Sequence, residues 1–255
     1  MSEPQAGAPV TAAMMIIGNE ILSGRTTDAN LPYVAGELTK LGIRLMEVRV
    51  VADIEAEIVD AVNALRARYT YLFTTGGIGP THDDITAAAV AKAFGVALHR
   101  RPDALAIMQR RYANPADLTP GRLKMTEVPV GAGLIDNPVS GAPGFQIANV
   151  YVMAGIPAVA RAMFDGLKHR LRGGPVMLSR TVVSNLGEGL IATDLAALQE
   201  RWPDIEIGSY PFHRRGVFGS SLVLRGTDAG RLDRAAEEVR ALVRRLGGTP
   251  SDEPA

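Results

Sequence analysis

The segment TTGGIGPTHDD, residues 74–84, combines a glycine-rich loop with two adjacent carboxylates. It follows an apolar run at residues 69–73 and precedes the helix-like pattern DDITAAAVAKAF. Glycines at such a point allow successive backbone N–H groups to turn toward an anion, and the start of a helix adds partial positive charge. The segment therefore predicts a phosphate-binding loop made of Thr75, Gly76, Gly77, Gly79 and Thr81.

Two carboxylates beside a phosphate repel it unless a divalent cation lies between them. Mg²⁺ characteristically joins one or two carboxylates to substrate phosphates and keeps several waters. Asp83 and Asp84 are therefore candidate metal ligands and catalytic residues for attack of water on a phosphoanhydride, with Mg²⁺ or Co²⁺ as the cation. The structural alternative is a tight turn in which Thr81 or Asp83 only caps the following helix.

Known nucleotide motifs do not describe this loop. No Lys-Ser or Lys-Thr pair follows its glycines, which excludes a Walker A motif, and the third glycine of the dinucleotide fingerprint is missing. The loop is therefore expected to bind phosphate in another way.

A second polar loop, GNEILSGRTTDAN at residues 18–30, follows the first predicted strand. If the first and third strands are neighbours, its polar residues face the glycine loop across the upper edge of the sheet. Asp28 and Asn30 could bind ribose hydroxyls or the amide edge of a pterin, whereas the structural alternative makes Asp28 the N-cap of the next helix. The candidates from this loop are Glu20, Ser23, Asp28 and Asn30.

A third candidate loop is NPVSGAPG at residues 137–144. Asn137, Gly141 and Gly144 could contribute side-chain or backbone groups to a ligand, although a surface loop of this composition needs no function.

These loops lie in an alternating pattern of elements. Strand-like runs precede helix-like runs three times in succession, a β-α-β-α-β-α order that predicts a three-layer α/β/α fold around a mostly parallel sheet. Asp53 is predicted to be the N-cap of the second helix. The predicted elements are strands at 14–17, 43–51 and 69–75, helices at 28–41, 54–66 and 85–94, a hairpin with its turn near Ala148-Asn149, and a helix at 157–171.

The remaining sequence predicts a small C-terminal α+β domain. Arg172-Gly173-Gly174-Pro175 is the best linker candidate, and it divides the chain into domains at residues 12–172 and 173–248. The second domain is predicted to contain strands at 176–183, 205–209 and 217–225 and helices at 188–201 and 229–246.

The amino-acid composition of the chain limits the classes of molecule that it can bind. Lys plus Arg and Asp plus Glu number 27 each, so the chain has no global positive field for nucleic acid or an anionic membrane. There is no cysteine, which excludes disulfides and thiolate sites. The N-terminus has no basic region and its apolar run is too short for a signal peptide. We expect a cytoplasmic homo-oligomer that binds a small nucleotide or pterin.

The segments IIGNEILSGRTTDAN, FTTGGIGPTHDDIT, NPVSGAPGF and MAGIP, in this order, resemble the molybdopterin-binding domain of molybdenum cofactor biosynthesis. The similarity is to the branch found at the N-terminus of CinA-type competence/damage-inducible proteins and of FAD synthases. It covers roughly residues 12–172, and GSYP with SSLVLRG extends it into the second domain. Because the sequence ends at Ala255, the deamidase domain of CinA proteins is not expected.

This resemblance implies a site for a pterin or nucleotide pyrophosphate. Asp84 matches the acidic residue that takes part in metal-dependent nucleotide transfer to molybdopterin in adenylyltransferase relatives. Asp83 favours the CinA-like branch, which implies a metal-dependent pyrophosphatase that hydrolyses ADP-ribose or FAD-like dinucleotides. Two alternatives stay open: a molybdopterin-binding protein that acts in cofactor assembly or delivery without hydrolysis, and a scaffold that oligomerises through its small domain.

Overall fold

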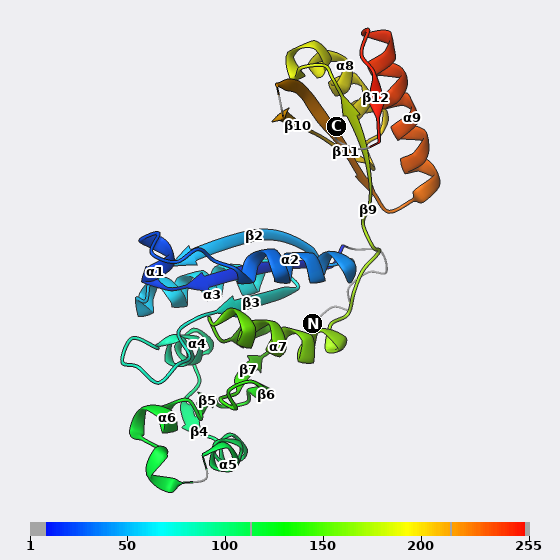
Figure 1. Ribbon diagram of the computed structural model, residues 1–255. Helices are drawn as coiled ribbons and strands as arrows, with labels where there is room; N and C mark the ends of the chain where they lie inside the picture. The colour runs from blue at the N-terminus through cyan, green and yellow to red at the C-terminus, as the bar shows by residue number, and fades with distance from the viewer. Residues whose placement is uncertain (1–8, 113, 215, 253–255) are drawn as a thin grey trace. The chain divides into compact units, whose positions relative to one another are not determined.

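The computed structural model describes residues 9–112, 114–214 and 216–252. The chain divides after Gly174 into two compact units, which are described separately (Figure 1). Among the described residues, no helix is long and apolar enough to cross a membrane.

The first unit is built on a six-stranded sheet with the order β2-β1-β3-β8-β7-β6. Strands β2, β1, β3 and β8 are parallel, and β7 and β6 join antiparallel at one edge. The predicted mostly parallel sheet is confirmed, and so is the adjacency of the first and third strands. The strands are β1 (Thr11–Ile17), β2 (Arg44–Val51), β3 (Tyr71–Thr75), β6 (Gly133–Ile135), β7 (Gly144–Ile147) and β8 (Val150–Met153).

Helices cover both faces of this sheet (Figure 1). Alternate residues of a strand point to opposite faces, and β1 follows this rule with apolar residues throughout. Met15 packs with α3 and α4 on one face, whereas Met14 packs with α2 and α7 on the other. This produces the predicted three layers. The helices are α1 (Asn19–Leu22), α2 (Asn30–Lys40), α3 (Glu55–Arg68), α4 (Thr86–Phe94) and α7 (Pro157–Leu167), which continues into η2 (Lys168–Arg170).

A smaller substructure lies between α4 and β6. Its two-stranded antiparallel sheet joins β4 to β5. It contains β4 (Leu98–Arg100), α5 (Pro102–Arg111), η1 (Pro115–Asp117), α6 (Pro120–Lys124) and β5 (Glu127–Pro129).

The predicted N-cap of α3 is wrong, and the alternative cap considered for α4 does not form. Helix α3 begins at Glu55 with Ile54 as its N-cap, so Asp53 lies outside the helix. Helix α4 begins at Thr86 with Ile85 as its N-cap and no capping side chain. Thr81 and Asp83 therefore do not cap α4.

The predicted turn between β7 and β8 is confirmed at Ala148-Asn149. Ala148 has a positive φ of 48°, which a tight hairpin requires. The Asn149 side chain donates to the carbonyl oxygens of Arg66 and Tyr69, at 2.9 and 3.0 Å, and so ties the hairpin to the end of α3.

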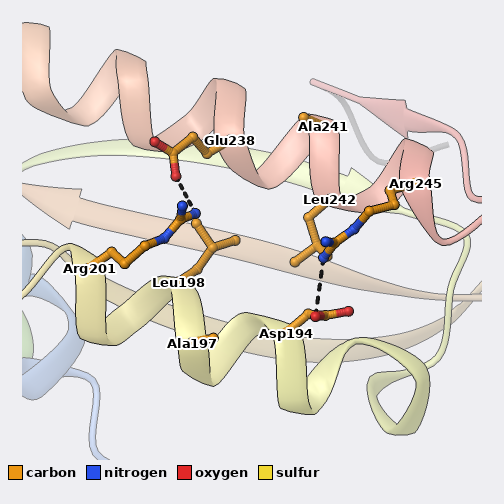
Figure 2. A pocket seen from close by; sticks show the side chains of 8 residues that line it. All are labelled: Asp194, Ala197, Leu198, Arg201, Glu238, Ala241, Leu242 and Arg245. Carbon is orange, nitrogen blue, oxygen red and sulfur yellow. Dashed lines mark hydrogen bonds and ion pairs between the residues drawn. The ribbon is translucent and has the colours of Figure 1, made fainter.

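The second unit has a four-stranded antiparallel sheet with the order β10-β11-β9-β12, covered by two helices. The helices lie side by side, and ion pairs join Arg201 to Glu238 at 2.5 Å and Arg245 to Asp194 at 3.1 Å (Figure 2). The predicted small α+β unit is confirmed. Its elements are β9 (Leu178–Ser184), α8 (Glu188–Arg201), β10 (Glu206–Arg214), β11 (Val217–Gly226), α9 (Ala229–Arg245) and β12 (Pro250–Ser251).

Candidate functional site

A cavity of about 630 Å³ opens at the carboxyl ends of the parallel strands of the first unit. Parallel strands place the loops that follow them at the same edge of the sheet, which is where α/β proteins bind ligands. The loops after β1, β2 and β3 all reach this cavity. Of the predicted site residues, those that line it are Glu20, Gly76, Gly77, Gly79, Asp83, Asp84 and Asn137.

The glycines after β3 are required by the packing of their loop. Gly76 has a φ of 104°, and a Cβ there would lie 2.1 Å from the carbonyl oxygen of Ile17. Gly77 has a φ of 67°, and its Cβ would lie 2.2 Å from the Thr86 hydroxyl. That hydroxyl donates to the Gly76 carbonyl oxygen at 3.0 Å. The loop is therefore pressed against β1 on one side and α4 on the other.

Gly76 does not act as the predicted anion donor in this conformation. Its N–H donates to the carbonyl oxygen of Met153 at 3.2 Å and so extends the pairing of β3 with β8. The backbone of Gly77 and Gly79 remains at the cavity wall, where no Cβ shields it.

Asp84 holds the tip of this loop in shape. Its Oδ2 accepts from the backbone N–H of Thr81 at 2.8 Å and from the Thr81 hydroxyl at 2.5 Å. A Cβ on Gly79 would lie 2.7 Å from the same oxygen, so the absence of a side chain there lets the carboxylate fold against the loop. Lys124 completes the arrangement by donating to the Thr81 carbonyl oxygen at 2.8 Å.

Asp83 is exposed at the mouth of the cavity. The neighbouring Thr81 side chain, followed by a local backbone N–H, holds the pKa of the Asp83 carboxyl below its usual value. The carboxylate form, which a cation requires, is therefore favoured.

Asp53 is a site residue that sequence reasoning missed. It follows β2, lines the cavity, and accepts from the backbone N–H of Asn19 at 2.8 Å. Its position in the sequence could have identified it. Because β2 is parallel to β1, a residue just after the end of β2 lies at the same edge of the sheet as the loop after β1. Tyr112 and Met125, from the smaller substructure, also line the cavity. Nothing in the sequence around them predicts that position.

The cavity is strongly acidic. Four carboxylates line it, those of Glu20, Asp53, Asp83 and Asp84, and no Lys, Arg or His does so within the described chain. The start of α7, at Pro157, also reaches the lining and contributes the positive end of a helix dipole. A phosphate ligand would need further positive charge here.

The donors fit a hard divalent cation, because carboxylate oxygens are the ligands that Mg²⁺ prefers. No group of three or more His, Cys, Asp or Glu side chains in the described ranges is arranged to hold a metal by itself. A cation bound by one or two carboxylates would therefore complete its shell with water and ligand oxygens.

Three other predicted residues, all from the second polar loop at residues 18–30, have structural roles. Asp28 Oδ2 accepts from the Leu31 N–H at 2.7 Å, in the first turn of α2. Asp28 therefore has a structural role at the start of this helix, but the N-cap is Ala29 and not Asp28. Asn30 is buried, and its Nδ2 donates to the Gly155 carbonyl oxygen at 2.8 Å. The Ser23 hydroxyl donates to the Glu20 carbonyl oxygen at 3.2 Å. None of these three lines the cavity.

The third loop is organised by Asn137. This buried side chain donates to the Ala142 carbonyl oxygen at 2.7 Å and to the Ser140 hydroxyl at 2.6 Å, and it accepts from the N–H groups of Val139 and Ser140. Ser140 and Ala142 line the cavity, whereas Gly141 lies between them with its φ at 81° and does not.

Two remaining predicted ligand residues are buried in the sheet. A Cβ on Gly144 would lie 2.3 Å from the Val152 carbonyl oxygen, so this glycine allows close strand packing and does not contact the cavity. Thr75 is buried at the end of β3, directly before the glycine loop.

Comparison with known proteins matches both units. A family model described as "Probable molybdopterin binding domain" matches residues 13–173, and one described as "FAD synthase, middle domain" matches residues 176–246. A protein of Pyrobaculum calidifontis is 34% identical over 211 residues, which cover 79% of this chain and 80% of that protein. The "Probable FAD synthase" of Caenorhabditis briggsae is 31% identical and covers 86% of this chain, but only 46% of its own length is matched.

A solved structure shares the fold of the first unit. It is the crystal structure of the protein CinA with unknown function from Thermoplasma acidophilum, which matches with a TM-score of 0.60 and 34% identity. The match covers 64% of this chain and 99% of that chain.

Proposed function

The chain belongs to the molybdopterin-binding domain family, in its CinA-like branch with an FAD synthase middle domain, and from this premise we propose that it is a metal-dependent nucleotide pyrophosphatase. Its substrates are ADP-ribose or FAD-like dinucleotides. The observation that carries the proposal is the pairing of Asp83 and Asp84 with a glycine loop in a cavity that no basic side chain lines within the described residues.

Charge decides between possible ligands of this cavity. A free pyrophosphate would meet four carboxylates and, among the described residues that line the cavity, no Lys, Arg or His. A divalent cation held by Asp83 or Asp84 would neutralise part of that negative charge and would draw the pyrophosphate toward the backbone of Gly77 and Gly79. Co²⁺ or Mg²⁺ would supply the Lewis acid that polarises a phosphoryl oxygen.

The proposed reaction is hydrolysis. A water oxygen forms a bond to one phosphorus, the bond from that phosphorus to the bridging oxygen breaks, and the leaving phosphate takes the electron pair. ADP-ribose then gives AMP and ribose 5-phosphate, and FAD gives AMP and FMN. Asp84 positions the loop and Asp83 offers a second carboxylate, while Glu20 also lines the cavity.

A second candidate is pterin binding without hydrolysis. The cavity is also lined by apolar side chains, among them Met125, Ile156 and Val159. Carboxylates can accept hydrogen bonds from the amino and ring N–H groups of a pterin, and apolar side chains can cover its flat faces.

The test is an assay for AMP. The full chain is incubated with ADP-ribose and with FAD, with Mg²⁺ or Co²⁺, and with or without chelator. We expect AMP only in the presence of metal, and much less AMP from Asp84→Asn. Asp117→Asn is the matched control, because Asp117 is an exposed carboxylate of η1 outside the cavity.

Two results would overturn the proposal. If Asp84→Asn still forms AMP at the rate of the unmodified chain, the charge of Asp84 is not needed for hydrolysis. No AMP from either substrate, together with a rise in melting temperature on adding molybdopterin, would select pterin binding instead.

A further inference from the structure

The cavity follows the carboxyl edge of the six-stranded sheet from one side to the other. Its lining includes Asp53 after β2, Glu20 after β1, Gly77 after β3, Gly155 after β8 and Asn137 after β6. With neighbouring strands about 4.8 Å apart, the five steps from β2 to β6 in the sheet order correspond to about 24 Å. A pyrophosphate at the glycine loop after β3 therefore leaves cavity on both of its sides, as a dinucleotide requires.

The two ends of the cavity differ in chemistry. Toward β2 and β1 it is lined by the carboxylates of Asp53 and Glu20 and by Thr26, which can accept hydrogen bonds from sugar hydroxyls. At the other end, the ends of α5 and α6 contribute Tyr112 and Met125. An aromatic ring beside a flexible thioether is a surface that can cover a flat heterocycle.

The ring of Tyr112 is supported from one face. The Arg122 guanidinium lies 4.2 Å from the ring centroid, and its Nη1 donates to the Asp117 carbonyl oxygen at 2.6 Å. Tyr112 lines the cavity and Arg122 does not, so Arg122 lies behind the ring and leaves its cavity side to a ligand. A ring that is already held in place loses little freedom on binding, which favours stacking.

Close packing fixes this ring relative to the glycine loop. A Cβ on Gly121 in α6 would lie 2.6 Å from the Pro80 carbonyl oxygen, and Lys124 of the same helix donates to the glycine loop. At the end of α5, Arg111 Nη2 donates to the Val139 carbonyl oxygen at 3.2 Å. Helices α5 and α6 are thus joined to the third loop and to the glycine loop, and they place Tyr112 at a set distance from the proposed pyrophosphate site.

We infer that Tyr112 stacks on the adenine ring of the substrate. The AMP half then lies toward α5 and α6, and the other half lies toward Glu20 and Asp53. This inference rests on the proposed function, because adenine is the ring that ADP-ribose and FAD have in common. The carboxylates at the far end suit the hydroxyl groups that the other half of both substrates carries.

Ser140 adds a directional contact at the adenine end. Its hydroxyl oxygen accepts from the Asn137 amide at 2.6 Å, so its own hydrogen can be donated to a ring nitrogen of adenine, which offers acceptors at its edge. Stacking on Tyr112 would hold the plane of the ring, and this hydrogen bond would hold its rotation within that plane.

Equilibrium binding separates the ring from the rest of the ligand. AMP and ribose 5-phosphate share the sugar phosphate and differ by adenine, so isothermal titration of both in the presence of Mg²⁺ measures what the ring contributes. We expect the unmodified chain to bind AMP more tightly than ribose 5-phosphate. Tyr112→Leu should weaken AMP binding by at least about fivefold, as the loss of an aromatic stacking partner does, and leave ribose 5-phosphate binding unchanged. Tyr112→Phe keeps the ring and should bind AMP as tightly as the unmodified chain.

Tyr210→Leu is the matched control, because Tyr210 is 49% exposed on β10 in the second unit. It should leave AMP binding unchanged, and circular dichroism verifies that each variant is folded. Three results would overturn the inference: equal affinity of the unmodified chain for AMP and ribose 5-phosphate, unchanged AMP affinity in Tyr112→Leu, or equal losses of both ligands in that variant.

The result for this subsite is independent of the result for hydrolysis. If Tyr112→Leu forms AMP from ADP-ribose with an unchanged KM, the subsite is overturned and the pyrophosphatase stands. If the unmodified chain forms no AMP but Tyr112→Leu loses AMP affinity, the subsite stands and hydrolysis is overturned. FMN is the remaining ligand to titrate: weaker binding of FMN but not of AMP to Tyr112→Leu would assign the ring on Tyr112 to flavin and overturn its assignment to adenine.

Discussion

The Asp84 carboxylate accepts two hydrogen bonds from Thr81, one from its backbone N–H at 2.8 Å and one from its hydroxyl at 2.5 Å. This pairing closes the loop between β3 and α4 and leaves Asp84 at the cavity wall. The same carboxylate therefore shapes the loop and supplies charge to the site, and substitutions can separate the two roles.

Asp84→Asn keeps an acceptor oxygen for Thr81 but removes the negative charge. We expect the free energy of unfolding to change by less than about 1.5 kcal/mol, as for the loss of one ordinary hydrogen bond, while Mg²⁺ binding weakens at least tenfold. Isothermal titration with Mg²⁺ and urea unfolding measure the two quantities. A variant that binds Mg²⁺ as tightly as the unmodified chain would contradict this role.

Gly77→Ala tests whether the glycine is required by conformation or by space. Its φ of 67° disfavours alanine, and the new Cβ would also lie 2.2 Å from the Thr86 hydroxyl. Gly24→Ala is the control, because Gly24 has a φ of 71° and open space around it. We expect a loss of about 1 kcal/mol for Gly24→Ala and of about 2 to 4 kcal/mol for Gly77→Ala, measured by urea unfolding. Equal losses would show that the contact with Thr86 costs nothing.

Asn137→Ala removes the side chain that organises the third loop. The buried amide makes hydrogen bonds to Ser140 and Ala142, which line the cavity. We expect unfolding to become easier by about 2 to 3 kcal/mol, because buried backbone groups lose their partners, and ligand affinity to fall as well. Asn114→Ala is the control, since that exposed side chain accepts from Ala116 in a surface turn outside the cavity lining. Unchanged ligand affinity in a folded Asn137→Ala protein would separate this loop from the site.

Lys168 gives the first unit a predictable response to acid. Its Nζ donates to Glu37 at 2.6 Å and to Asp165 at 2.7 Å, which joins α2 to the end of α7. Hydrogen bonds from Lys168 are the largest cause that holds the pKa of each carboxyl below its ordinary value, 4.5 for Glu37 and 3.8 for Asp165. Both carboxylates therefore stabilise the fold above those values, and that stabilisation is lost as pH falls through the lowered folded-state values.

Lys168→Met is expected to flatten this acid-dependent loss of stability. Urea unfolding at a series of pH values between about 2 and 6 measures the slope. Lys40→Met is the matched control, because Lys40 donates to Glu37 from an exposed position and makes no hydrogen bond to Asp165 within the described residues, so it should change the slope less. An unchanged slope in Lys168→Met would show that other groups set the acid response.

The layers of the fold could be predicted from the sequence, because the spacing of apolar residues that marks a strand or a helix is visible within a short segment. The buried run before Gly18 and the one before Gly76 identify β1 and β3 without any knowledge of contacts. In the second unit, α8 lies at the predicted residues 188–201. Strand β10 extends to Arg214, beyond its predicted end at residue 209, because an edge strand tolerates Pro211.

The site was harder to predict, since its contacts join distant parts of the chain. The carboxylate of Asp53 looked like a helix cap from its neighbours Glu55 and Glu57, but it accepts from Asn19, which is 34 residues away. Asn30 looked like a ligand residue but reaches Gly155, across 125 residues. Local sequence cannot distinguish a polar side chain that faces a ligand from one that holds a loop.

The exit of the chain from the first unit is fixed at the edge of the sheet opposite the cavity. The Arg172 N–H donates to the Tyr71 hydroxyl at 2.9 Å, and the Gly174 N–H donates to the Leu41 carbonyl oxygen at 3.1 Å. Tyr71 begins β3 and Leu41 precedes β2, whereas the cavity follows the ends of those strands. A different domain fused after Gly174 would therefore be attached at the edge of the sheet away from the mouth of the cavity.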